Sequence, residues 1–307
     1  VIKIITWFYK AKYLSILLFS LLLPSLVFSS TFNVTTTQEF RAALTNSAGN
    51  GESDTINLAA GTYKTTDDGL GTFSFLDNED FDLTIEGVDA DTTILSGDDQ
   101  DRVLSLNVVG SDVTVTIKKL SVSEGFKRTF PNAAGGGIYS QENILLIGCN
   151  LKNNEAHEGG GLYITSNKKV TIENSIFENN KGDFGGALYQ RSGGVGHAVV
   201  KDSRFIANHG NNYGGAFYLA GNALIINSVF KANTSKFSGA INLPQTGTVS
   251  VKSSVFSGNS AESFAVMAKN GGYSNVSIIN SIFYGNLSEG NEGTNLKEIV
   301  RLTSSGG

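Results

Sequence analysis

A histidine and an aspartate occupy matching places in successive copies of a repeated phrase. His157 and Asp183 each come shortly before a glycine-rich segment, 26 residues apart. Neighbouring copies of a stacked repeat lie about 5 Å apart, so we expect the two side chains to meet. An imidazole beside a carboxylate is an acid/base pair that can move a proton in a bound substrate. Polar residues are also common at turns, so the alternative is that the two residues have no catalytic role.

Further polar residues accompany this pair. Glu158 lies beside His157, and Asn212 and Lys236 continue the same column in later copies. Arg204, with Asp202 and Lys201 close by in sequence, forms a second cluster and is a weaker catalytic candidate. Charged side chains on an outward-facing column are also simply solvated, which explains this cluster equally well.

Metal chemistry has little support in the sequence. The acidic run "SGDDQD" at 96–101 could bind Ca²⁺, but it lacks the full ligand spacing of a known calcium loop, and an ordinary polar turn is the alternative. His197 and His209 have no matching ligand nearby in sequence. We therefore predict no cofactor and no metal site, with Ca²⁺ as the alternative.

A row of tyrosines is the strongest candidate for ligand binding. Each tyrosine follows the apolar residue of a glycine-rich phrase, in "GGGIY", "GGGLY", "GGALY" and "GGAFY". An outward row of this kind is expected to expose ring faces that pack against sugars or a partner strand. Cross-strand aromatic pairs that only stabilise the sheet are the alternative. The row consists of Tyr139, Tyr163, Tyr189 and Tyr218.

All these residues are positioned by a repeat between Cys149 and Asn286. Six copies begin at "CNLKNN", "SIFENN", "SRFIAN", "SVFKAN", "SVFSGN" and "SIFYGN", in steps of 26, 28, 25, 26 and 27 residues. Such a period indicates coils that bury their apolar faces against their neighbours. Short stretches with apolar and polar residues alternating predict strands. We expect an all-β fold, a single-stranded right-handed parallel β-helix.

The residue types in each column predict which way the side chains point. The phenylalanine and serine columns are expected to face inward, and Cys149 belongs to the serine column, so we interpret it as a packing residue. Two asparagine columns are expected at turns. In the first, the residue types tolerate left-handed backbone angles, and stacked side chains can also bond to each other along the axis. The first contains Asn174, Asp202, Asn227, Ser253 and Asn280; the second contains Asn154, Asn180, Asn208, Asn233, Asn259 and Asn286.

The two ends of the chain differ from the repeat. Residues 1–29 read as a signal peptide, because three lysines precede an apolar run; a retained membrane anchor is the alternative. Residues 30–53 are predicted to form an N-terminal cap with one amphipathic helix, which has capping-box spacing between Thr36 and Glu39. The β-helix is expected over 54–290, and 291–307 is expected to be an incomplete C-terminal tail.

Charge and export limit the possible partners. Residues 1–29 carry three lysines and no acid, so the remainder has 20 basic against 28 acidic residues. A surface with this excess of acid disfavours nucleic acid as a partner. We expect a secreted protein or one at the cell surface or outer membrane, with membrane contact only through export or an anchor domain outside this sequence. A glycan or a cell-surface molecule is the expected partner.

The paired "GGA(I/L/F)" and "FxxN" phrases resemble the repeats of chlamydial polymorphic outer-membrane proteins and similar bacterial surface β-helix proteins. The N-terminal segment "VTTTQEFRAAL…DTINLAAGTY" resembles the N-terminal cap of secreted right-handed β-helix proteins. The resemblance covers about residues 32–290 and implies a displayed or secreted passenger with an adhesive or structural role, with glycan binding as a candidate activity. The same fold houses pectate lyases, so a polysaccharide lyase or glycoside hydrolase acting on acidic polysaccharide is the alternative. A self-associating structural protein is the third hypothesis.

Overall fold

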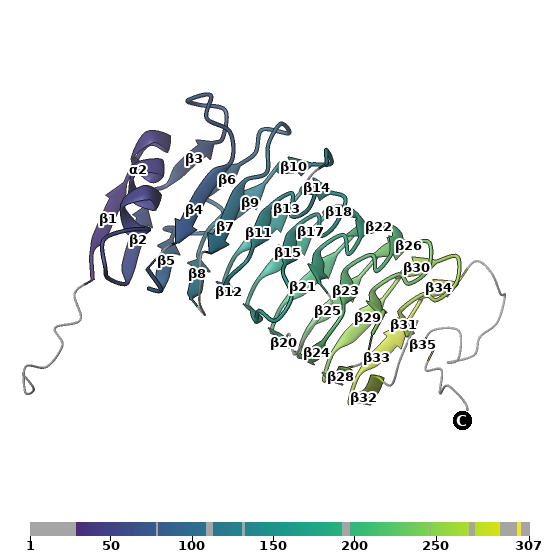
Figure 1. Cartoon of the computed structure of the whole chain (residues 1–307). Helices are drawn as coiled ribbons and strands as arrows, with labels where there is room; N and C mark the ends of the chain where they lie inside the picture. Colours follow the sequence, from purple (N-terminus) through teal and green to yellow (C-terminus); the bar gives the residue numbers. More distant parts are fainter. Residues whose placement is uncertain are drawn as a thin grey trace, which may run out of the picture.

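The chain forms a stack of parallel coils. The computed structural model describes residues 29–77, 79–108, 113–130, 133–191, 197–245, 247–269, 274–288 and 300–301. In these residues it is an all-β solenoid of about nine turns with a single short helix, and Figure 1 shows the coils running from the purple N-terminal end to the yellow C-terminal end. Almost all of the predicted signal peptide and tail lies outside the described residues. Within them, no helix is long and apolar enough to cross a membrane.

Every sheet of the solenoid is parallel, and neighbouring strands come from successive coils. The ten-stranded sheet contains β1 (Thr31–Val34), β2 (Asp54–Leu58), β5 (Leu83–Glu86), β8 (Thr114–Lys118), β12 (Asn143–Ile147), β16 (Val170–Glu173), β20 (His197–Lys201), β24 (Asn222–Ile226), β28 (Gly247–Lys252) and β32 (Ser274–Ile279). The β3–β33 sheet contains β3 (Gly61–Lys64), β6 (Thr93–Ser96), β9 (Ser121–Ser123), β13 (Asn150–Lys152), β17 (Ile176–Glu178), β21 (Arg204–Ile206), β25 (Val229–Lys231), β29 (Val255–Ser257) and β33 (Ile282–Tyr284).

The remaining two sheets border the glycine-rich phrases. The seven-stranded sheet contains β10 (Phe126–Lys127), β14 (Glu155–Ala156), β18 (Lys181–Phe184), β22 (His209–Tyr213), β26 (Thr234–Ser235), β30 (Ser260–Ala261) and β34 (Leu287–Ser288). The β4–β35 sheet contains β4 (Phe73–Asp77), β7 (Leu104–Val108), β11 (Ile138–Ser140), β15 (Leu162–Ile164), β19 (Leu188–Gln190), β23 (Phe217–Leu219), β27 (Ile241–Leu243), β31 (Met267–Lys269) and β35 (Val300–Arg301).

The first predicted turn column has the expected backbone. These residues link the ten-stranded sheet to the β3–β33 sheet, and all have left-handed angles, which Asn, Asp and Gly adopt at the lowest cost. Their φ angles are 60° for Gly148, 49° for Asn174, 51° for Asp202, 47° for Asn227, 49° for Ser253 and 49° for Asn280.

The second asparagine column forms a buried ladder inside the turn. The Asn180 amide donates to Asn208 Oδ1 over 3.0 Å and to the Leu151 carbonyl over 2.9 Å. Asn154, Asn208, Asn233 and Asn259 repeat these two bonds. The axial bonding expected in the first column occurs there between Asn227 and Asp202 Oδ1, over 2.5 Å, but it is repeated from coil to coil only in the second column. The reason is that the second column points inward, where each amide must find a partner.

Aromatic and serine columns fill the interior as predicted. The rings of Phe205, Phe230 and Phe256 stack with centroids 4.9 and 4.8 Å apart, and all three are fully buried. In the serine column each hydroxyl accepts a bond from the backbone amide of the preceding coil, as Ser203 does from Ser175 over 3.2 Å. Cys149 is in this column, and burial raises its thiol pKa to about 12, as expected for a packing residue.

Glycines at the phrases allow three chain segments to pack closely. A Cβ on Gly186 would lie 2.4 Å from the Gly215 carbonyl oxygen and 2.5 Å from that of His209. A Cβ on Gly160 or Gly215 would meet backbone equally closely. An apolar, buried residue follows the glycines or their equivalents in each coil, and it pairs with its counterpart in the next coil, as Ile241 does with Met267.

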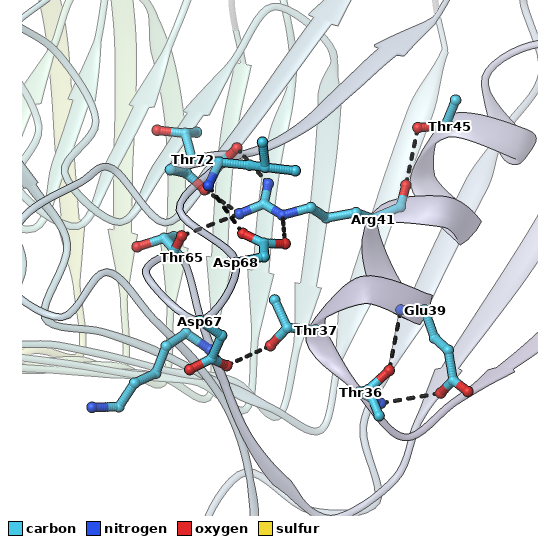
Figure 2. A network of polar contacts seen from close by, with 12 residues as sticks. Thr36, Thr37, Glu39, Arg41, Thr45, Thr65, Asp67, Asp68 and Thr72 are labelled. Atoms are coloured by element: carbon cyan, nitrogen blue, oxygen red, sulfur yellow. Dashed lines mark hydrogen bonds and ion pairs between the residues drawn. The ribbon is translucent and has the colours of Figure 1, made fainter.

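The N-terminal end is covered by helix α2 (Thr37–Ser47), as predicted. Thr36 and Glu39 form the capping box, and Phe40, Ala43 and Leu44 are buried against the first coils. Figure 2 shows how Arg41 fixes the loop after β3: its Nε lies 2.6 Å from Asp68 Oδ2, and its guanidinium also donates to the backbone carbonyls of that loop. The helix therefore closes the stack and is anchored to it.

Candidate functional site

A hollow of about 440 Å³ lies where the glycine-rich phrases meet the β4–β35 sheet. Phe130, Ala133 and Ala134, which follow β10, line one side, and tyrosines of the strands β11, β15 and β19 line another. We call it the tyrosine hollow. It brings together three of the four predicted tyrosines and the predicted catalytic histidine. Its lining consists of Phe130, Ala133, Ala134, Tyr139, His157, Glu158, Tyr163, Tyr189 and Arg191.

His157 and Asp183 are in contact, as the spacing predicted. His157 Nδ1 lies 2.5 Å from Asp183 Oδ2, and the Asp183 backbone amide donates to the His157 carbonyl over 2.8 Å. The carboxylate fixes the orientation of the imidazole through Nδ1. Among the described residues, no hydrogen-bond partner occupies Nε2. The second nitrogen is thus available to a ligand in the tyrosine hollow.

Asp183 is the centre of a polar network. Arg128 Nη2 donates to Asp183 Oδ1 over 2.9 Å, and its Nη1 donates to Glu155 over 3.2 Å. Asn211 also donates to Asp183, and His209 Nε2 lies 3.0 Å from Asn211 Oδ1. Burial raises the pKa of the Asp183 carboxyl, but the hydrogen bonds from Asn211, Arg128 and His157 outweigh it, so the pKa lies below its ordinary value.

The tyrosine row differs from its prediction in one respect. Tyr139, Tyr163, Tyr189 and Tyr218 stack with centroids 4.8–5.3 Å apart and interplanar angles of 4–6°. The ring faces therefore cover one another, and the expected exposed strip of faces was wrong. Tyr163 is 3% exposed although it lies outside the solenoid core. What the row offers a ligand is ring edges and phenol groups.

The tyrosine phenols are neutral and lie near two charged side chains, Arg191 and Glu158. Burial raises the pKa of Tyr163, Tyr189 and Tyr218, and the Glu158 charge adds to the effect. Tyr163, whose phenol oxygen accepts a hydrogen bond from the guanidinium, raises the pKa of Arg191, and the Glu158 carboxylate contributes further. Neutral phenols both donate and accept hydrogen bonds, as sugar hydroxyls require.

A second arginine lies directly behind the row. The Arg102 guanidinium carbon is 4.7 Å from the centre of the Tyr139 ring, and Nη2 donates to the Ala134 carbonyl over 2.6 Å. The side chain is buried, which lowers its pKa to about 10, so it is charged at neutral pH. Arg102 therefore supports the floor of the hollow and makes its potential more positive.

The family of the chain follows from its repeat. The model of the right-handed β-helix region matches residues 106–296. This chain belongs to that family. The model does not distinguish polymorphic outer-membrane proteins from other β-helices, so that resemblance stays a prediction.

Solved structures of polysaccharide lyases are similar to this β-helix in fold. They include a mannuronic acid specific polysaccharide family 6 lyase from human gut microbiota, with 13% identity, a TM-score of 0.47 and coverage of 84% of this chain and 59% of that one. Pectate lyase Bsp165PelA from Bacillus sp. N165 has 10% identity and a TM-score of 0.36, with coverage of 87% of this chain and 85% of that one. The PL6 family alginate lyase AlyGC has 14% identity and a TM-score of 0.33, with coverage of 84% of this chain and 39% of that one. The chain thus spans less than two thirds of either family 6 lyase. A search of curated proteins gave no match.

The other residues proposed for catalysis or metal binding lie outside the tyrosine hollow. Arg204 is exposed on β21, in the β3–β33 sheet, while Lys201 pairs with Glu173 over 3.1 Å. In the acidic run, Asp98 is ion-paired with Lys64 over 2.7 Å. The described residues contain no cluster of three acidic, histidine or cysteine side chains that could hold a metal ion. His197 is exposed at the start of β20.

Sequence reasoning missed three contributors to the hollow. Arg191 directly follows β19, two residues after a row tyrosine, and this offset was the available signal. Phe130 belongs to a loop outside the repeat and is 76% exposed. Arg102 reaches the row only through the length of its side chain, so no periodicity reveals it.

Proposed function

We propose that this β-helix is an exported protein that binds an acidic polysaccharide in the tyrosine hollow. The observation that carries the proposal is the convergence of Arg191, neutral phenols and an exposed aromatic ring on one concave surface. Sites for small ligands are typically concave, with apolar walls and few well-placed polar groups. The hollow is concave, but its surface is mainly polar, which suits a ligand rich in hydroxyl and carboxylate groups.

Positive charge supports an acidic ligand. The chain has six arginines and a net negative charge, yet Arg102, Arg128 and Arg191 all lie in or beside the hollow. Arg128 and Arg102 are engaged by protein groups and are less accessible, whereas Arg191 is exposed, although it also bonds to Tyr163 and lies near Glu158. A guanidinium binds a carboxylate through two parallel hydrogen bonds. Arg191 is therefore the group proposed to bind the uronate carboxylate.

The role proposed for the protein is adhesive. Binding without turnover would suit a rigid rod that presents its site away from an attachment point, as in a secreted or surface-displayed passenger. The regular stack supports this role, because each coil contacts only its neighbours and the rod keeps its shape along its length.

Binding to size-defined oligomers of galacturonate and mannuronate tests the proposal, with neutral glucan oligomers as the comparison. Arg191→Gln removes the charge and is expected to weaken binding about tenfold or more, since hydrogen bonds to charged groups contribute about 1.5–3 kcal/mol. Arg204→Gln is the matched control, because it removes an exposed arginine from another sheet. Equal binding of neutral oligomers, or equal losses in the two variants, would refute the assignment.

A lyase is the second candidate, and the His157–Asp183 contact favours it. Elimination from a uronate needs a base at the proton beside the carboxyl and an acid at the leaving oxygen. His157 Nε2 could accept that proton while a row phenol supplies the other. The same oligomers, followed by ultraviolet absorbance of the unsaturated product with and without Ca²⁺, separate the two functions. Turnover that is lost in His157→Ala would replace the adhesive proposal with the lyase.

A further inference from the structure

A second row of aromatic rings runs along the solenoid axis beside the tyrosine row. Phe184 and Tyr213 stack with centroids 5.9 Å apart, and Tyr213 and Phe237 stack at 4.5 Å. All three side chains are half-buried at the surface. Each directly precedes a glycine-rich phrase, in "DFGG", "NYGG" and "KFSG". We call these three residues the axial row.

The axial row is continuous with the tyrosine hollow. The Phe184 ring packs edge-on against His157, with centroids 5.6 Å apart, and His157 lines the hollow. Tyr218 makes a second connection, because it stacks on Tyr189 and contacts both Phe184 and Tyr213. A ligand that leaves the hollow along the axis therefore meets aromatic rings in successive coils.

The charges beside the axial row match an acidic chain. Lys236 is exposed, and its Nζ lies 5.7 Å from the centre of the Phe237 ring. At the end near the hollow, Arg128 lies beside His157 through their common partner Asp183. Asp183 itself is half-buried and engaged by three donors, so it offers little free negative charge.

We propose that the axial row, with Lys236, extends the tyrosine hollow into a track on which a polyuronate chain lies along the solenoid axis. This inference rests on the proposed function and specifies its ligand as a polymer of several sugar units. The outward ring edges of the half-buried axial row give the sugar units an apolar surface to lie on, and Lys236 meets a carboxylate further along the chain.

Chain-length dependence distinguishes a track from a single subsite. Oligouronates long enough to pass from the hollow to Phe237 gain contacts that short ones lack, so affinity should rise with length. Phe237→Leu keeps an apolar side chain but removes the flat ring. We expect it to weaken binding of long oligomers about fivefold and to leave binding of short ones unchanged.

Calorimetry with galacturonate and mannuronate oligomers of graded length provides the measurement. Phe237→Trp restores a flat ring and is expected to restore the length dependence. Val229→Ala, a half-buried outward position on β25, controls for a general loss of stability. Thermal unfolding of all variants shows whether Phe237 acts only by stabilising the sheet.

Each outcome separates the track from the function on which it rests. If Phe237→Leu keeps the wild-type length dependence while Arg191→Gln loses binding, the track is wrong and the hollow remains. If Phe237→Leu weakens short and long oligomers alike, in proportion to a loss of stability, the row is only structural and the track is again overturned. If the wild-type protein binds no uronate oligomer, the proposed function fails and the track fails with it.

Discussion

Asp183 is the residue on which the polar contacts beside the tyrosine hollow converge. His157, Arg128 and Asn211 each bond to its carboxylate, and these residues come from three different coils. One charge thus orients the imidazole and fixes the loop that carries Arg128. The geometry of the hollow depends on that carboxylate staying ionised.

Acid should therefore weaken the fold through Asp183. Its pKa in the folded protein lies below the ordinary value of 3.8. The contribution to stability is present above that ordinary value and is lost as the pH falls through the lowered pKa. We expect Asp183→Asn to be less stable than wild type at neutral pH and the difference to shrink on acidification, as measured by urea unfolding at a series of pH values.

A control for this comparison exists within the repeat. Asp202→Asn places asparagine at a left-handed turn where neighbouring coils already carry it. If Asp183→Asn loses no more stability at neutral pH than Asp202→Asn does, the role given to Asp183 is contradicted.

A contact between two side chains could be predicted from the sequence when both occupy equivalent positions of the repeat. His157 and Asp183 occupy equivalent places in adjacent coils, so their spacing alone indicated the contact. Arg128 lies in a loop outside the repeat, and Arg102 acts through a long side chain. Their positions depend on loop conformation and rotamer, which a column of residue types does not contain.

The glycine-rich phrase is the element that joins the structure to the site. It brings one coil's backbone against two other segments, and this close approach places the tyrosine row beside the loop of Phe130. A side chain at Gly186 would clash with two carbonyl oxygens of the backbone, which cannot move aside as a flexible side chain can.

We expect Gly186→Ala to lower the free energy of unfolding by about 3 kcal/mol, because overpacking against fixed backbone strains the coil. Denaturant unfolding measures the change. Gly49→Ala is the control, since a Cβ there meets nothing within 4 Å, and it should alter stability by less than about 0.5 kcal/mol. Similar effects in the two variants would show that the phrase tolerates a side chain.

The tyrosine row shows which structural property of a strand the sequence pattern does not determine. The alternation correctly placed the row outside the core, because it determines which face of a strand a side chain occupies. It did not determine the ring orientation. Parallel strands bring identical residues into register, as in the pairing of Tyr139 with Tyr163, and flat rings in register stack face to face. The faces are thereby buried.

In the whole molecule, stability is expected to be local along the axis. Each coil contacts mainly the coils before and after it, so a solenoid behaves as a chain of nearest-neighbour units. The repeat in the sequence made this architecture and its core columns predictable, and the capping-box spacing of Thr36 and Glu39 made the helical cap predictable. The loop after β3 that holds the cap was not, because it lies before the regular repeat and is fixed by a single arginine.

Arg41 tests this picture of the whole molecule. It joins the cap to the first coils through Asp68 and the backbone carbonyls of the loop (Figure 2). Its guanidinium also lies over the face of Phe73, 4.5 Å from the ring centre. Arg41→Met removes these contacts, so we expect amide hydrogen exchange in β1, β2 and β3 to accelerate about tenfold or more, while exchange in β16–β28 stays unchanged. Lys64→Met is the control, because it breaks a more exposed ion pair in the same region. Faster exchange along the entire stack would mean that the solenoid unfolds as one unit, and the nearest-neighbour description would then fail.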